Sequence, residues 1–100
     1  MKLRFIGKND GKAALTRDQI KIMREFTIWV MKKFLSERIL ADIEMIVTLD
    51  GQLLKKEKMH GQSVWMDRPN RPREFEISVD TSSKFQNAMH TLSHELVHVK

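Results

Sequence analysis

Residues 73–100 read REFEISVDTSSKFQNAMHTLSHELVHVK, an alternating segment followed directly by a helical one. In residues 73–80 apolar and polar side chains alternate, as in a strand with one buried face, and the apolar ones are Phe75, Ile77 and Val79. Beyond them, apolar residues recur at helical spacing, and Ser83 with Gln86 fits a capping box. The segment therefore predicts a strand over 73–80 and a helix over 84–100.

The predicted helix has two chemically different faces. At 100° per residue its apolar side chains form a narrow stripe that must face the core, namely Phe85, Ala88, Met89, Leu92, Leu96 and Val99. Its three histidines, His90, His94 and His98, follow one another at intervals of four on the opposite side. The histidines are therefore predicted to lie outside the core.

Residues 94–98 form the motif His-Glu-x-x-His. Residues four apart on a helix lie one turn above each other, with about 5–6 Å between their Cβ atoms, so His94 and His98 can converge on one Zn²⁺. Glu95 lies close to the same face and can take a proton from a water whose pKa the metal lowers towards ~7. The motif predicts zinc as the cofactor, with His94 and His98 as ligands and Glu95 as the catalytic base.

The remaining elements precede this unit. Thr16 with Gln19 fits a capping box, and it opens a helix predicted over residues 16–38. The buried face of this helix is predicted to be broad, with Ile20, Met23, Thr27, Val30, Met31 and Phe34, widened by Ile22, Phe26 and Trp29. Alternation predicts a strand over residues 42–49, and Leu3 with Phe5 indicates a short strand over residues 2–6. Residues 59–66 are a further candidate strand, whereas residues 52–58 fit either a loop or a short helix. Residues 1–100 are thus expected to form a single α+β domain.

The stretch TLSHELVHVK, preceded by RPREFEISVD, resembles the zincin-type metallopeptidases, most closely the small SprT-like and phage-encoded peptidases. The layout of nearly the whole chain fits that family's N-terminal subdomain, a small mixed sheet with a long N-terminal helix and a C-terminal HExxH helix. Only the last ten or so residues are specific. The resemblance implies a zinc-dependent endopeptidase with His94 and His98 as ligands, Glu95 as general base and a protein or peptide substrate.

In that family an edge strand binds the substrate backbone by strand addition. The strand before the HExxH helix is usually an inner one, which places the edge at residues 59–66, although the alternation of residues 73–80 leaves both possible. Val64 and Trp65 on the first of these strands, and Arg68 beside it, are candidates for substrate contact, with surface packing as the alternative.

A catalytic zinc takes three protein ligands and a water. The resemblance places the third ligand after the motif helix, so we expect the natural protein to continue beyond Lys100 and the 100-residue chain alone to be inactive or nearly so. His90 and His60 are the alternatives within the chain, although His90 also fits a cleft wall or a solvated position and His60 fits a surface position. Glu44, Glu74 and Glu76 are candidates for orienting the ligand histidines, or are solvent-facing strand residues.

Composition narrows the other function classes. The chain has no cysteine, which excludes disulfides and thiolate metal sites, and no apolar run long enough for a signal peptide or a membrane span. We therefore expect a cytoplasmic protein, in the host cytoplasm if a phage encodes it. The net charge of +5 suggests an acidic partner such as DNA, or simply a solvated surface. A catalytically inactive binding module and a DNA-associated protein on the same scaffold remain the alternatives to a peptidase.

Overall fold

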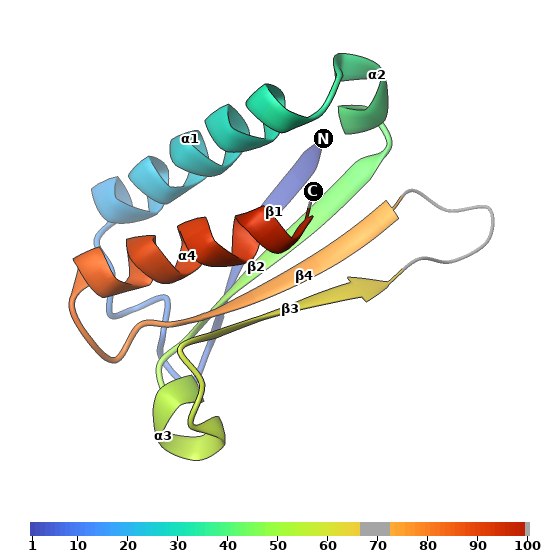
Figure 1. Cartoon of the computed structure of the whole chain (residues 1–100). Helices are drawn as coiled ribbons and strands as arrows, with labels where there is room; N and C mark the ends of the chain where they lie inside the picture. The colour runs from blue at the N-terminus through green and yellow to red at the C-terminus, as the bar shows by residue number, and fades with distance from the viewer. Residues whose placement is uncertain (67–72, 100) are drawn as a thin grey trace.

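A computed structural model describes residues 1–66 and 73–99, except for the side chains at positions 65, 66, 73, 98 and 99. Within these residues the fold is α+β, with one four-stranded mixed sheet (Figure 1). The strands are β1 (Lys2–Lys8), β2 (Ile43–Asp50), β3 (Gly61–Met66) and β4 (Arg73–Asp80), in the spatial order β1-β2-β4-β3. β2 is parallel to both β1 and β4, and β3 is antiparallel to β4. The predicted strands are confirmed within two residues at each end.

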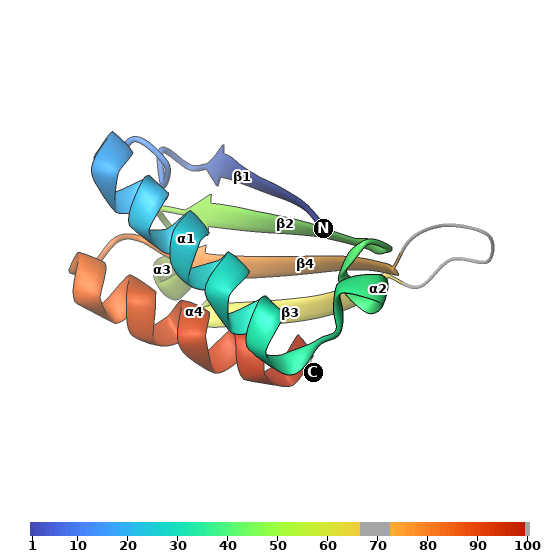
Figure 2. The same cartoon turned by 90° about the horizontal axis from the view of Figure 1, so that it is seen from above.

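Two long helices, α1 (Arg17–Phe34) and α4 (Phe85–Val99), lie side by side on one face of the sheet (Figure 2). α4 packs next to β3 and β4, and it begins five residues after β4 ends. The predicted capping box of α1 is confirmed, because the Thr16 hydroxyl accepts from the Gln19 amide and the Gln19 side chain accepts from the Thr16 amide. The alternation and periodicity of the sequence thus predict both layers of the fold.

The single helix predicted over residues 16–38 is correct as far as residue 34 and wrong at its C-terminal end. α1 ends at Phe34, and Leu35 has extended backbone with φ −127°. Ser36 then caps a separate short helix, α2 (Glu37–Leu40), by accepting a hydrogen bond from the Ile39 amide. A serine competes for backbone hydrogen bonds and favours a helix start over a helix interior, which explains the break. The ambiguous residues 52–58 contain the short helix α3 (Leu53–Glu57), which ends at Lys58 in the left-handed conformation.

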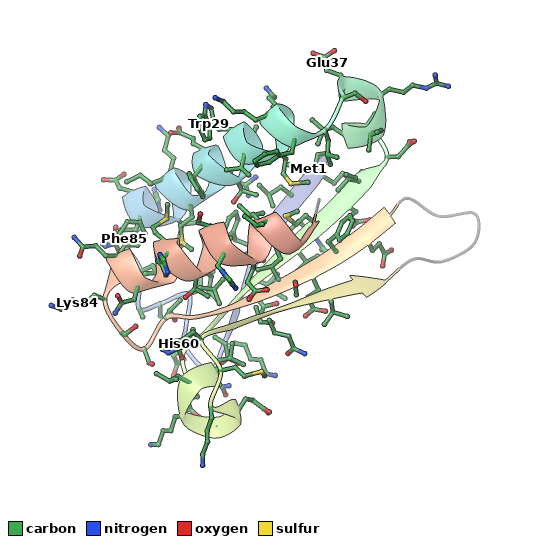
Figure 3. The ribbon with its side chains drawn as sticks, viewed as in Figure 1. Met1, Trp29, Glu37, His60, Lys84 and Phe85 are labelled. Carbon is green, nitrogen blue, oxygen red and sulfur yellow. The ribbon has the colours of Figure 1, made fainter. Side chains whose placement is uncertain are left out.

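The buried face of α1 is narrower than its sequence predicts. Met23, Thr27, Val30 and Met31 are buried as expected. Ile22 and Trp29, however, are 48% and 56% exposed, and Trp29 points away from the sheet (Figure 3). Phe34, at the end of the helix, is 50% exposed. The sheet covers only one side of this helix, so the wide apolar arc has more surface than the fold can bury.

The core lies between the helices and one face of the sheet. That face contains Met45, Val47 and Leu49 from β2 and Phe75, Ile77 and Val79 from β4, all buried. The alternate residues of the same strands point to the other face, where Thr48 donates a hydrogen bond to Glu76. Within the described residues, no helix is long and apolar enough to cross a membrane.

Candidate functional site

α4 presents His90 and His94 on a different side from the described residues of its apolar stripe, as predicted. Ala88, Leu92 and Leu96 are at most 1% exposed, and Phe85 and Met89 pack against the same core. His90 and His94 are exposed. The backbone of α4 is helical through residue 98, so position 98 lies one turn beyond His94, although the side chain of His98 is outside the described part of the chain.

His94 and Glu95 open on one cleft, of about 600 Å³, between α4 and the start of β3. The cleft is lined by Asn87, His90, Thr91, His94 and Glu95 from α4 and by Met59, His60 and Gly61 from the opposite side. His60 lies at the start of β3, beneath α4 in the view of Figure 3. The structure thus brings together His94 and Glu95, two residues singled out by the motif, and adds His60 and His90 to the same cleft.

Glu95 is the acidic residue of the motif, and only 8% of its surface is exposed. Its Cγ lies 3.3 Å from the position that a Cβ on Gly61 would take, so its methylene stem packs against the backbone of β3. Within the described residues, every buried side-chain nitrogen or oxygen has a hydrogen-bond partner. Packing of its stem against β3 thus leaves Glu95 buried but at the wall of the cleft.

The wall opposite α4 is fixed by residues at the carboxyl end of β4. The backbone amide of Asp80 donates to the carbonyl of His60 at 2.8 Å, which ties the start of β3 to the end of β4. The buried Asp80 carboxylate accepts hydrogen bonds from the Leu54 amide and from both the amide and the hydroxyl of Ser82. Asp80 therefore links α3 and the loop that leads into α4 through its carboxylate, and the wall of the cleft through its backbone amide.

Asp50 forms an equivalent anchor at the carboxyl end of β2, where it pairs with Asp80 in the sheet. Burial alone would raise the pKa of Asp50. Hydrogen bonds from the Asn9 side chain and the Gln52 amide, together with the positive charges of Lys8 and Lys56, outweigh burial and lower this pKa below its ordinary value of 3.8. The ionised form of Asp50 therefore stabilises the loops beside the sheet.

The edge strand expected at residues 59–66 is confirmed as β3, which pairs with β4 alone among the described strands. Val64 is 40% exposed and pairs with Glu76, so it lies on the sheet face away from α4 and does not line the cleft. Trp65 is in β3, but its side chain is outside the described residues, and so is all of Arg68. Any contact of Val64 with a substrate in the cleft would therefore have to come from its backbone.

The three glutamates considered as partners of the ligand histidines lie elsewhere. Glu44, Glu74 and Glu76 alternate with the buried, helix-facing residues of β2 and β4, so they occupy the opposite face of the sheet from α4. They cannot orient His94 or His98 from there. Among the described residues, no three His, Asp or Glu side chains are arranged to hold a metal ion.

The sequence interpretation missed four residues that line the cleft, two on α4 and two on the opposite wall. Asn87 and Thr91 could have been found, because they precede His94 and Glu95 by seven and four residues and so share their side of the helix. Met59 and Gly61 carry no comparable signal, since their place opposite α4 depends on the antiparallel pairing of β3 with β4.

Comparison of the chain with protein-family models, with curated proteins and with solved structures gives no match.

Proposed function

We propose that the protein is a zinc-dependent peptidase of zincin type. The observation that supports this most directly is the shared cleft, because His94 and Glu95 open on it and position 98 follows one turn later on the same helix. A metal ligand beside a carboxylate, in a cleft bordered by an edge strand, is an arrangement that suits metal-assisted hydrolysis of a peptide bond.

Two residues of α4 fit a zinc ion through their spacing, with His94 and His98 one turn apart on a regular helix. We expect the third protein ligand to lie outside the described residues. Zinc, when bound, polarises the scissile carbonyl and lowers the pKa of the attacking water. Glu95 takes the proton of that water as it attacks the carbonyl carbon, and passes it to the nitrogen as the C–N bond breaks.

The edge strand β3 fits the task of holding the substrate. Its outer edge is not paired with another described strand, so its backbone amides and carbonyls are available to an extended peptide. Gly61 places the beginning of this strand in contact with Thr91 and Glu95. A peptide added to β3 would therefore run past the Glu95 carboxylate.

Zinc binding is the first test. Titration of the chain with Zn²⁺, followed by calorimetry, should show one site that is lost in His94→Ala and in His98→Ala. Ser93→Ala is the matched control, since Ser93 is an exposed neighbour on α4 that does not line the cleft. Zinc affinity that is unchanged by both histidine substitutions would reject the proposed site.

Hydrolysis of fluorescein-labelled casein is the second test. Without a third ligand, we expect the 100-residue chain to hold zinc weakly and to turn over little or no substrate. In a protein that does cleave casein, Glu95→Gln should keep the bound zinc and lose cleavage, because glutamine has the same shape but cannot accept the proton. Cleavage that persists in Glu95→Gln would show that another group is the base.

A further inference from the structure

One end of the cleft has no part in the proposed chemistry. Along α4 the lining residues run from Asn87 through His90 and Thr91 to His94 and Glu95. The base and the metal ligand thus occupy one end, and the part near the beginning of the helix extends about two turns further. His60 lines this part from the opposite wall.

The side chains at this end are rich in hydrogen-bond donors. The imidazoles of His60 and His90, the amide of Asn87 and the hydroxyl of Thr91 can all donate, and Glu95 is the only acidic residue among the described lining residues. These donors come from two elements that are fixed to each other. His60 is tied to β4 through its carbonyl, and Gly61 packs on Thr91.

The direction of the chain determines which part of a substrate reaches these donors. β3 and α4 run in the same direction, with Gly61 at the level of Thr91 and Glu95 (Figure 1). A peptide that adds to β3 in the antiparallel sense runs from the Met66 end towards the Gly61 end. Its C-terminal side, which becomes the leaving amine, therefore points towards His60, His90 and Asn87.

We infer that His60, His90 and Asn87 form a subsite that binds a carboxylate of the substrate on the C-terminal side of the scissile bond. This inference rests on the proposed function. The carboxylate is either the C-terminus of the peptide or the side chain of an Asp or Glu close to the cleavage point. Hydrogen bonds to an ionised acceptor are about twice as strong as neutral ones, so this subsite prefers a carboxylate to an amide.

Three acetylated penta-alanine peptides test the subsite. The first has a free C-terminal carboxylate, the second has a C-terminal amide, and the third has an amide with glutamate in place of the last alanine. Binding to ¹⁵N-labelled Glu95→Gln protein is followed by NMR, with and without Zn²⁺, so that no cleavage occurs and the result does not depend on a bound metal. We expect the free carboxylate, the glutamate peptide or both to bind roughly tenfold more tightly than the plain amide.

Variants then assign this preference to the subsite. His60→Ala combined with His90→Ala should bring the three peptides to equal affinity, and Asn87→Ala should reduce the difference. Gln86→Ala is the matched control, because Gln86 is exposed on the same turn of α4 but does not line the cleft. A preference that survives in the double histidine variant, or equal binding of all three peptides to the parent protein, overturns the inference.

The outcome also separates the subsite from the peptidase proposal. Carboxylate preference in a protein that binds no zinc through His94 and His98 would support the subsite and reject the peptidase. Zinc binding through these histidines without a carboxylate preference would support the peptidase and reject the subsite. A higher affinity for the free C-terminus than for the glutamate peptide identifies the chain terminus as the recognised group, and the opposite order identifies an acidic side chain.

Discussion

Substitution of Gly61 by alanine should show how closely β3 must approach α4. The added Cβ would lie 2.4 Å from Cγ2 of Thr91, 3.1 Å from the carbonyl oxygen of Ser78 and 3.3 Å from Cγ of Glu95. Carbon atoms in contact stand about 3.5–4.0 Å apart, so Thr91 would have to move by roughly 1 Å. Thr91 is β-branched and stiff within a helix, and the other two contacts leave β3 little room to shift.

Overpacking of this kind costs about 1–3 kcal/mol. Gly61 does not have a positive φ, so alanine can adopt its backbone conformation. Alanine also reduces the conformational entropy of the unfolded chain, which stabilises the folded state by about 0.4–1 kcal/mol. Urea unfolding should therefore show Gly61→Ala to be destabilised by about 1–2 kcal/mol. In a Thr91→Ser background the clashing methyl is absent, and the same substitution should be neutral or slightly stabilising.

Thr91→Val is the matched control, because it keeps a branched side chain and should keep the penalty. The reasoning is refuted if Gly61→Ala leaves the free energy of unfolding unchanged, or if its cost is the same in the Thr91→Ser and Thr91→Val backgrounds.

Three further predictions concern parts of the fold away from the cleft. Thr16→Ala removes the capping box of α1 and should cost about 0.5–2 kcal/mol in urea unfolding without changing zinc affinity, and a loss of zinc binding would contradict the separation of the two. The folded protein lowers the pKa of Asp50 below 3.8, its ordinary value in the unfolded chain. The contribution of Asp50 to stability is therefore present at pH values above 3.8 and is lost as the pH falls below that value and through the pKa of the folded state. Thermal melts from acid to neutral pH should show this loss, and Asp50→Asn should flatten the curve; a parallel curve would argue against the anchor. Trp29→Gln should change stability by about 1 kcal/mol or less, because Trp29 is exposed and loses mainly its contacts with Lys33 and with the Phe26 ring, whereas Leu92→Ala should cost about 2–5 kcal/mol. Equal losses in the two variants would contradict the burial of these side chains.

Much of the fold could be predicted from local patterns. The alternation of residues 73–80 gives β4 at its observed bounds, and the periodicity after it gives α4 with Ala88, Leu92 and Leu96 in the core. Such patterns work because one side of each element is buried and the other is not. They fail where burial is decided by distant residues, as for Trp29, whose apolar character predicted a buried position that the sheet does not reach.

The candidate site could be predicted only on its helical side. The motif names His94 and Glu95, and the structure places both in one cleft. His60 was considered as a surface residue or a remote ligand, because nothing in its sequence neighbourhood indicates that it faces α4. Its position follows from the hydrogen bond between its carbonyl and the Asp80 amide, a contact between residues twenty apart that no local pattern encodes.

The order of the strands has a consequence for how quickly the cleft can assemble during folding. β1 pairs with β2 through residues as distant as Lys2 and Glu44, whereas β3 and β4 are consecutive and meet at Met66 and Glu74. Pairings that are close in sequence close smaller loops and form faster, so the β3–β4 pair and the helix that follows it can associate before the parallel strands join. Every described residue that lines the cleft lies within residues 59–95. We therefore expect the walls of the cleft to form before the long-range contacts of β1 that complete the sheet.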